Sequence, residues 1–458
     1  MNGDGGDPGG RCPPDPTDIP AFWSCRGRDS SVGSREIMRP FRRAPAVLTA
    51  LLLASSPSHG QKPNYDESRV PDYKLPEPLA LGGTFTRSKD TWEKKMRPAT
   101  LAILEREMYG SPPAPAQPLS FSFNLENEVQ DAGDGTVVRR SYLITFSHPG
   151  SPQLRLLLYL PRGARKVPAF LGLNFRGNHT LEKDPRIPLE TGYVLGAHRT
   201  GDNTTLAAKN RGIAAGRWPV TTITDRGYAL ATLCCGNIDP DFDDGFRNGV
   251  HAMFPTAGKG GWGTIATWAW GLGRILDVLN QVREVDAGRV AVIGHSRLGK
   301  TALWAGAIDQ RFAMVISNNS GCGGAALSKR AFGETVGLIN RACPHWFNAR
   351  FKQYNDNEAA LGFDQHQLIA LIAPRPVYVA SASEDLWADP RGEFLSLLHA
   401  EQAYLLYHDR PLGVAGHPEP GKSVGTLMGY HLRKGKHDIT AQDWAHYLDF
   451  ADRWLGKK

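Results

Sequence analysis

The chain has 458 residues, of which 41% are hydrophobic and 22% are charged, and it carries a net charge of +7. This apolar content is sufficient for a large globular core, so the composition excludes a chain that is disordered throughout. Lys and Arg are scattered, and no basic run is flanked by aromatic residues. The charge pattern therefore argues against a nucleic-acid partner and fits a weak attraction to acidic polymers.

The first sixty residues divide into two parts. Residues 1–37 are rich in Gly, Pro, Asp and Arg without apolar periodicity, and we interpret them as a disordered or non-native leader before a start at Met38. Residues 38–60 join "MRPFRR" and "APAVLTALLLA" to small residues at Ser58 and Gly60, which predicts a signal peptide; the alternative is a buried helix. No later apolar run could span a bilayer, so we expect a secreted or periplasmic protein without a membrane partner after signal removal.

A single domain is predicted over residues 88–458, preceded by an extended arm over residues 61–87. The domain begins with a sequence of helical spacing, "SKDTWEKKMRPATLAILEREMYG". Ser88 or Asp90 is the candidate N-cap of this helix and Gly110 is the candidate stop.

Strands and helices then alternate along the chain. The predicted strands span 119–129, 136–148, 154–161, 167–175, 228–235, 288–296, 312–321, 375–385 and 403–409. The predicted helices span 262–281, 297–309 and 440–456. The turn sequence "QDAGDG" makes the first two strands a hairpin, and Thr440 and Asp443 form an acidic capping box for the last helix. This alternation predicts an α/β fold with a mostly parallel sheet flanked by helices on both faces.

Four cysteines follow the leader, namely Cys234, Cys235, Cys322 and Cys343. Their spacing matches no zinc signature, and adjacent cysteines do not pair readily with each other. We therefore interpret them as structural residues and assign no disulfide connectivity.

The segment "GHSRLGKT", from Gly294 to Thr301, fits two different motifs. It matches a phosphate-binding loop, and it also resembles a nucleophile elbow centred on Ser296, with Leu298 in place of the second glycine of G-x-S-x-G. A phosphate-binding loop normally opens its domain and needs a second strand that ends in Asp to hold Mg²⁺. Here the loop follows several strands, and the next strand ends in "SNNSG", so the serine elbow is favoured.

The rest of the chain supplies partners for such a serine. Serine hydrolases on an α/β sheet carry their triad in the order Ser, acid, His, and Asp385 ends a predicted strand while His437 directly precedes the last helix. The histidine takes the serine proton, and the carboxylate orients and stabilises the imidazolium. Glu384 is an alternative candidate for the acid. Asp385 could instead cap a helix, and His437 could instead be a histidine of a surface loop. His366 is interpreted as a structural histidine.

Several motifs together resemble the glucuronoyl esterases of carbohydrate esterase family 15, most closely the bacterial members. They are "GHSRLGK", "LNFRGNHT", "DQHQLIALIAPRPVYVASASEDLWADPRGEF" and "KHDIT", and the resemblance extends over residues of roughly 90 to 455. It implies an α/β-hydrolase fold without metal or cofactor. It also implies hydrolysis of esters between 4-O-methyl-glucuronic acid and lignin alcohols in glucuronoxylan. An esterase for acetylated xylan and an inactive carbohydrate-binding relative are the alternatives, and no oligomeric state is predicted.

The resemblance also assigns roles to residues. It makes Ser296 the nucleophile and Arg297 the oxyanion stabiliser, through its backbone N–H and its guanidinium. It brings further side chains toward the sugar, namely Lys300, Trp387, Glu334 and Asn340, although Trp387 taken alone would fit the core equally well. The sequence departs from the family at Asn319, where many members have Glu. We therefore expect Asp385 to be the catalytic acid.

Overall fold

The computed structural model describes residues 62–81, 83–112, 119–133, 135–190, 192–194, 208–254 and 261–456. The predicted leader and signal peptide lie outside these residues. Within them, no helix has the length and apolar character to cross a membrane. The same ranges contain no cluster of three or more His, Cys, Asp or Glu side chains that could hold a metal ion.

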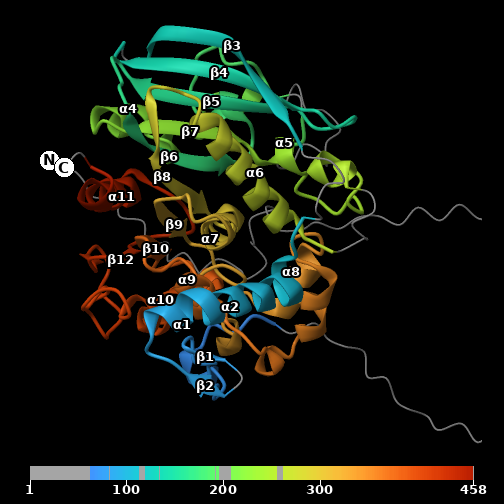
Figure 1. Cartoon of the computed structure of the whole chain (residues 1–458), viewed down its shortest axis with the longest axis vertical. Coiled ribbons are helices and arrows are strands. Elements are labelled where there is room, and N and C mark those ends of the chain that lie inside the picture. Colours follow the sequence, from blue (N-terminus) through green and yellow to red (C-terminus); the bar gives the residue numbers. More distant parts are fainter. Residues whose placement is uncertain are drawn as a thin grey trace, which may run out of the picture.

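A ten-stranded sheet in the order β11-β12-β10-β9-β8-β6-β7-β5-β4-β3 forms the centre of the molecule (Figure 1). Its strands are β3 (Phe121–Ala132), β4 (Val137–Phe146), β5 (Leu154–Pro161), β6 (Val167–Asn174), β7 (Ala229–Cys234), β8 (Val285–His295), β9 (Met314–Asn318), β10 (Val377–Ala382), β11 (Ser423–Val424) and β12 (Met428–Arg433). A separate two-stranded sheet pairs β1 (Ala80–Leu81) with β2 (Thr84–Phe85).

The large sheet has a parallel part and an antiparallel part. Strands β7, β6, β8, β9, β10 and β12 run parallel to their neighbours in that order. Strands β3, β4 and β5 are antiparallel, and β5 joins the rest by antiparallel pairing with β7. The predicted hairpin is confirmed as β3 and β4. All eight residues of β6 are buried, as expected for a parallel strand covered on both faces.

Helices cover both faces of the sheet. They are α1 (Lys89–Thr91), α2 (Arg97–Leu104), α4 (Val220–Asp225), α5 (Cys235–Ile238), α6 (Thr264–Leu279), α7 (Arg297–Ile308), α8 (Val336–Ala342), α9 (Gln365–Ala370), α10 (Pro390–Tyr404) and α11 (Ala441–Trp454). Successive strand residues point to opposite faces. Leu171 of β6 accordingly belongs to the core that includes α6, α7 and α10, whereas Phe170 belongs to the core with α4 and α11.

The first helix spans nearly the predicted segment but is not regular. The Ser88 side chain caps its start by accepting from the Thr91 N–H at 3.3 Å, and Gly110 ends it with φ of 73°. Two π-helical turns, Trp92–Met96 and Glu105–Tyr109, flank α2. Short 3-10 turns elsewhere are η1 (Glu67–Arg69), η4 (Asn178–Thr180), η6 (Ala215–Arg217), η7 (Gly249–Met253), η8 (Ser328–Arg330), η9 (Ala349–Tyr354), η10 (Glu358–Ala360) and η11 (Leu386–Ala388).

One predicted strand is wrong. The segment 403–409, "AYLLYHD", begins with the last two residues of α10 and continues in a turn, and the last parallel strand is β12. A short apolar run does not distinguish a strand from the end of a helix. The run here continues the helical spacing of Phe394, Leu397 and Ala400, which are all buried. Gly429 interrupts the apolar pattern of β12 in the sequence. The position has no room for a side chain, because a Cβ there would lie 2.2 Å from the Tyr378 ring.

The parallel strands bring distant segments to one edge of the sheet. The carboxyl ends of parallel strands lie on the same side, which is where open α/β sheets carry their sites. Ser296 follows β8, Asn319 follows β9, Asp385 follows β10 and His437 follows β12.

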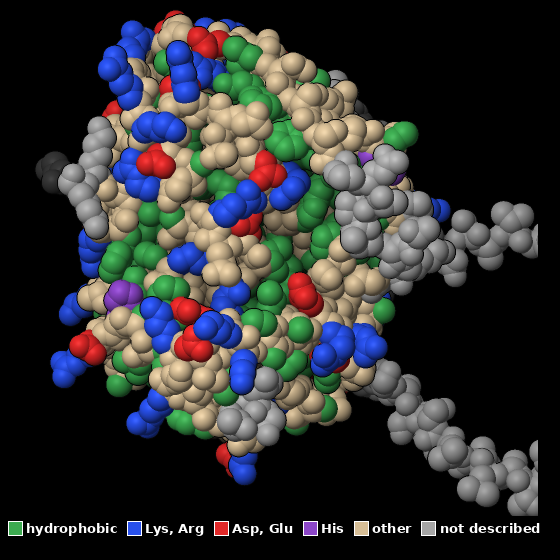
Figure 2. All heavy atoms as spheres, viewed as in Figure 1, with side chains coloured by type: hydrophobic (Ala, Val, Ile, Leu, Met, Phe, Trp, Pro, Cys, Tyr) green, Lys and Arg blue, Asp and Glu red, His purple; other side chains and the backbone are tan. Residues whose placement is uncertain are grey.

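On the molecular face in Figure 2, Lys and Arg side chains lie dispersed among acidic and apolar ones. All four cysteines after the leader are buried.

Candidate active site

Ser296 lies at a sharp turn between β8 and α7. Its backbone has φ of 59° and ψ of −129°, a combination that a residue with a side chain rarely adopts and that is often found at functional sites. The turn is possible because Gly294 has no side chain, since a Cβ there would lie 1.8 Å from the Leu298 carbonyl oxygen. Gly299, which is one position after the second glycine of G-x-S-x-G, lies close to Ser320. The local geometry is therefore that of a nucleophile elbow.

His437 lies beside this elbow and is paired with Asp385. The distance between His437 Nδ1 and Asp385 Oδ2 is 2.5 Å. The His437 side chain is 30% exposed and the Asp385 side chain 5% exposed. The His437 ring centroid is 4.6 Å from that of His295, the residue before Ser296. Asn319 donates to the same carboxylate oxygen of Asp385 at 2.8 Å, so Asp385 joins the histidine to the end of β9.

Arg433 holds the loop that carries His437. Its guanidinium donates to the Lys436 carbonyl at 2.7 Å and to the Asp438 carbonyl at 3.1 Å, on the two sides of the histidine. Asp443 accepts from Arg433 Nε at 2.9 Å and from the Thr440 N–H at 2.7 Å. The predicted capping box of α11 is confirmed, and its aspartate also fixes the histidine loop.

Glu393 of α10 lies behind Asp385 and is fully buried. Its carboxylate accepts from the backbone N–H groups of Ser320 and Gly321 at 2.7 and 3.0 Å, and from Ser381 Oγ at 2.6 Å. Burial raises the pKa of Glu393 to about 7, with a further contribution from the charge of Asp385, while these hydrogen bonds act in the opposite direction. Glu393 therefore ties α10 to the ends of both β9 and β10.

Arg297, the first residue of α7, forms a buried ion pair with Asp241. Its guanidinium also lies over the Trp346 ring, 4.7 Å from the centroid, and Trp346 Nε1 donates to Asp241 at 2.8 Å. Burial alone would raise the pKa of Asp241, but the charge of Arg297 and the hydrogen bonds from His345 and Trp346 outweigh it and hold the pKa well below its ordinary value. A cation is thus fixed one residue from Ser296 by a carboxylate that stays ionised.

Lys300 lies one helical turn after Ser296 and is also buried. Its Nζ donates to the Ser320 carbonyl at 2.6 Å and to Glu334 Oε2 at 3.2 Å. Burial raises the pKa of Glu334, and the opposing influences are the Lys300 charge and a hydrogen bond from the Trp387 side chain. The Glu334 backbone N–H also donates to the Trp387 carbonyl at 2.9 Å. The structure therefore brings Lys300, Glu334 and Trp387 together.

Asn340, also expected near the sugar, makes its described hydrogen bonds outside this group. Its amide nitrogen donates to Asn355 Oδ1 at 2.7 Å and to the Phe351 carbonyl at 3.4 Å. These contacts tie α8 to η9 and engage the amide in packing between helices.

The model of the family "Glucuronyl esterase, fungi" matches residues 223–407. A protein named carbohydrate esterase MZ0003, from an unknown prokaryotic organism, is 46% identical over 421 residues, which cover 89% of this chain and 96% of that protein. This chain belongs to carbohydrate esterase family 15, the glucuronoyl esterases. The family prediction is thereby confirmed.

Solved structures of glucuronoyl esterases have the same fold. The enzyme from Solibacter usitatus is 42% identical with a TM-score of 0.80, over 85% of this chain and all of that one. A structure described as a promiscuous esterase of this family from a marine bacterial metagenome is 47% identical with a TM-score of 0.79, over 86% of this chain and all of that one. The predicted α/β-hydrolase fold is confirmed, and the chain is a carboxylic ester hydrolase.

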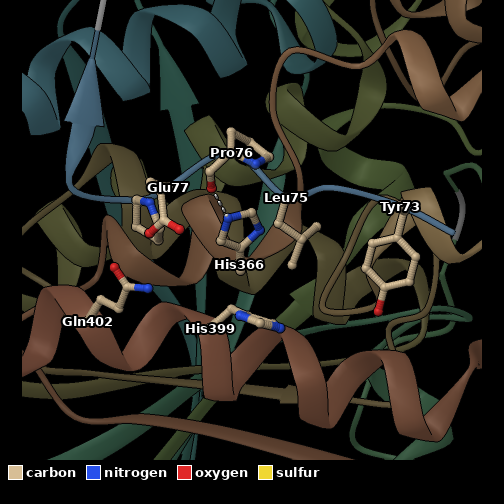
Figure 3. Close-up of a pocket in the computed structure, with 8 residues that line it drawn as sticks. Tyr73, Leu75, Pro76, Glu77, His366, His399 and Gln402 are labelled. Carbon is tan, nitrogen blue, oxygen red and sulfur yellow. Dashed lines mark hydrogen bonds between the residues drawn. The ribbon is translucent and has the colours of Figure 1, made fainter. Parts of the chain in front are cut away.

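A cavity of about 370 Å³, which none of the candidate-site residues lines, lies between the N-terminal arm and helices α9 and α10 (Figure 3). Its lining residues are Tyr73, Leu75, Pro76, Glu77, Pro78, His366, His399 and Gln402. His366 Nε2 donates to the Pro76 carbonyl at 2.8 Å, and burial lowers the pKa of His366 to about 4. A neutral His366 therefore fastens the arm to α9.

Two buried acids of this glucuronoyl esterase, Asp241 and Glu393, were not predicted from the sequence. Asp241 contacts Arg297 across 56 positions, and Glu393 contacts Ser320 across 73 positions. Neither contact joins residues at the spacing of a helix or strand repeat, so no periodic pattern in the sequence indicates it. The available signal for Glu393 was its place directly before Phe394, because an acid among apolar residues that become buried needs buried donors.

Proposed function

We propose that this chain hydrolyses esters of glucuronic or 4-O-methyl-glucuronic acid, as in the lignin-carbohydrate esters of glucuronoxylan, through an acyl-enzyme on Ser296. The observation that carries the proposal is the 2.5 Å contact between His437 and Asp385 beside the strained Ser296 turn. An imidazole held by a carboxylate next to a serine is the arrangement that activates a hydroxyl for acyl transfer. The family names support the uronate as the acyl group.

The proposed reaction has two steps. Ser296 Oγ attacks the ester carbonyl while His437 Nε2 takes its proton, and collapse of the tetrahedral intermediate releases the alcohol with that proton. Water then attacks the acyl-enzyme with the same assistance, which yields glucuronate and the free serine. Asp385 holds the Nδ1 proton and stabilises the imidazolium throughout.

Arg297 is assigned to the charge that develops on the carbonyl oxygen. The first backbone amides of a helix point toward its N-terminus, and Arg297 is the first residue of α7. Its side chain adds a cation already fixed by Asp241 and Trp346, so little reorganisation is needed when the oxyanion forms. Stabilisation of this kind acts on the transition state more than on the neutral ester.

Lys300, Glu334 and Trp387 are assigned to the sugar. Lys300 has three donors, of which one reaches Glu334 and one reaches the Ser320 carbonyl. A fixed ammonium and a carboxylate side by side match the donors and acceptors of vicinal hydroxyl groups. Trp387, which is half-buried next to Glu334, offers an apolar ring face.

Three esters test the assignment: benzyl glucuronate, methyl galacturonate and p-nitrophenyl acetate. We expect benzyl glucuronate to have the highest kcat/KM, with turnover lost in Ser296→Ala. Intact-mass measurement during wild-type turnover should detect a uronyl adduct on the serine. Efficient cleavage of the acetate without cleavage of glucuronate esters would point to another carbohydrate ester. Absence of turnover on all three would favour an inactive carbohydrate-binding relative.

We infer export of the chain from residues 38–60 alone. N-terminal sequencing of protein recovered from the periplasm or the medium should give a sequence that begins after this segment. Recovery of a chain that retains it in the cytoplasm would contradict the inference.

A further inference from the structure

The first described stretch of the chain is tied down at several points. The Asn64 carbonyl accepts from the Gly333 N–H at 2.8 Å, and Glu67 accepts from Arg330 at 2.6 Å. Arg330 is itself buried and paired with Asp389, the N-cap of α10. Farther along, His366 holds Pro76 (Figure 3). The arm predicted as an extended surface segment is thus fixed to the rest of the chain between Asn64 and Pro76.

These ties bring Tyr65 to the residues of the candidate site. Asn64 contacts Gly333, the neighbour of Glu334. Gly333 in turn packs against the turn after Asp385, because a Cβ on it would lie 2.4 Å from the Leu386 carbonyl oxygen. Burial raises the pKa of the Tyr65 hydroxyl, and the charges of Asp385 and Glu334 raise it further. Tyr65 is therefore a neutral side chain near both carboxylates.

The Tyr65 ring packs against a neighbouring ring and is also exposed to solvent. It packs edge to face on Phe332, with the ring centroids 6.3 Å apart, while 48% of the residue is exposed. Leu386, which directly follows Asp385, is 42% exposed. Single exposed apolar residues are ordinary on protein surfaces. An exposed aromatic ring on an anchored segment beside catalytic groups is instead the form of a preorganised contact for a ligand.

We propose that Tyr65 forms an outer glycan subsite, where it stacks on the xylose ring that carries the glucuronate. This proposal rests on the proposed function and adds the polysaccharide side of the substrate. A pyranose has an apolar C–H face with hydroxyls at its edge, which suits a tyrosine ring with its hydroxyl. The glycan is favoured over the alcohol because Asn64, the neighbour of Tyr65, accepts from Gly333, the neighbour of Glu334. Glu334 in turn contacts Lys300, and both are assigned to the sugar.

The test varies the two ends of the substrate independently. Four esters are compared: the methyl and benzyl esters of glucuronic acid, and the same two esters of glucuronic acid linked to xylotriose. Tyr65→Ala should raise KM for both xylotriose-linked esters by roughly 3- to 30-fold, and should change the two monosaccharide esters far less. Tyr65→Phe keeps the ring and should retain most of the wild-type affinity. Phe85→Ala, a matched loss of an aromatic ring that is 51% exposed in the β1–β2 hairpin, should change none of the four.

Other outcomes would overturn the subsite. If Tyr65→Ala raised KM for the two benzyl esters but not for the two methyl esters, the ring would lie at the alcohol. An equal loss of kcat on all four esters would mean a structural role. No effect would mean no contact. Calorimetry on Ser296→Ala with glucuronic acid and with xylotriose-linked glucuronic acid separates this proposal from the proposed function. Preferential binding of the linked acid that Tyr65→Ala abolishes would support the subsite even if no ester were cleaved.

Discussion

Two groups of residues lie near Ser296, and the buried acids in each group have different kinds of partner. In the cationic group, Asp241 lies against Arg297 and Glu334 lies against Lys300. The histidine group consists of His437, Asp385, Asn319 and Glu393. Its two carboxylates accept from an imidazole, an amide, backbone N–H groups and hydroxyls, with no Lys or Arg among their described hydrogen bonds.

The difference follows from what each group does in the proposed reaction. Arg297 and Lys300 keep their charge throughout, and a permanent buried cation needs a permanent partner because an unpaired buried charge costs several kcal/mol. His437 must gain and lose a proton in each step. A fixed cation beside Asp385 would compete with the imidazolium for the carboxylate, and the 30% exposure of His437 lets solvent share its transient charge.

The largest effect is expected from the histidine group, in Asp385→Asn. An amide retains the shape but cannot stabilise the imidazolium by charge, so kcat should fall by roughly 10²–10⁴-fold with little change in KM. Steady-state kinetics on benzyl glucuronate measures this. Glu384→Gln is the matched control, because Glu384 is the exposed neighbour of Asp385. Near-normal kcat in Asp385→Asn together with an inactive Glu384→Gln would reverse the assignment of the acid.

The two groups should also respond oppositely to pH. The pKa of Asp241 is lowered in the folded state, so its stabilisation is complete above its ordinary value of 3.8 and is lost as the pH falls below it. Asp241→Asn should therefore lower the free energy of unfolding by roughly 3–5 kcal/mol at all pH values from 5 to 8. The pKa of Glu393 is raised from 4.5 to about 7, so its ionisation destabilises the fold progressively as the pH rises through that range.

Glu393→Gln mimics the protonated acid and makes this contrast measurable. Relative to wild type, it should become more stable between pH 5 and pH 8 by on the order of 2 kcal/mol, whereas the difference between Asp241→Asn and wild type stays constant. Urea unfolding of the three proteins at both pH values gives these differences. A constant difference for Glu393→Gln would show that the backbone and hydroxyl donors hold the carboxylate ionised throughout this range.

The same contrast explains what the sequence could predict. The order of Ser296, Asp385 and His437 along the chain, each after a predicted strand or before the last helix, was sufficient to expect them on one edge of a parallel sheet. Asp241 and Glu393 were not predictable, because an acid buried against a distant partner has no period in the sequence. Asn340 was expected at the sugar only through the family resemblance, and no pattern in the sequence indicates the contact of its amide with Asn355.

In the cationic group, Lys300→Ala should raise KM more than it lowers kcat. The sugar hydroxyls are present in both the ground and transition states, and a charged hydrogen bond contributes roughly 1.5–3 kcal/mol. The variant also leaves Glu334 buried without its cation, so it should be compared with Lys300→Ala in a Glu334→Gln background. Kinetics on benzyl glucuronate with thermal unfolding of both variants separates lost binding from lost stability. A loss confined to kcat would instead assign Lys300 to the transition state.

The smallest effect is expected at Asn319, where many glucuronoyl esterases have Glu. Its amide orients Asp385 without supplying charge, so Asn319→Ala should lower kcat by about tenfold or less, well below the effect of Asp385→Asn. Asn319→Glu combined with Asp385→Asn offers His437 a carboxylate from the end of β9 in place of the one after β10. Partial recovery of kcat over the Asp385→Asn single variant is expected. It should come with reduced stability, because residue 319 has φ of 47°, a left-handed conformation that Asn tolerates better than Glu. If the double variant is no more active than Asp385→Asn, a carboxylate on β9 cannot reach the imidazole in this chain, and the histidine depends on the strand that holds Asp385.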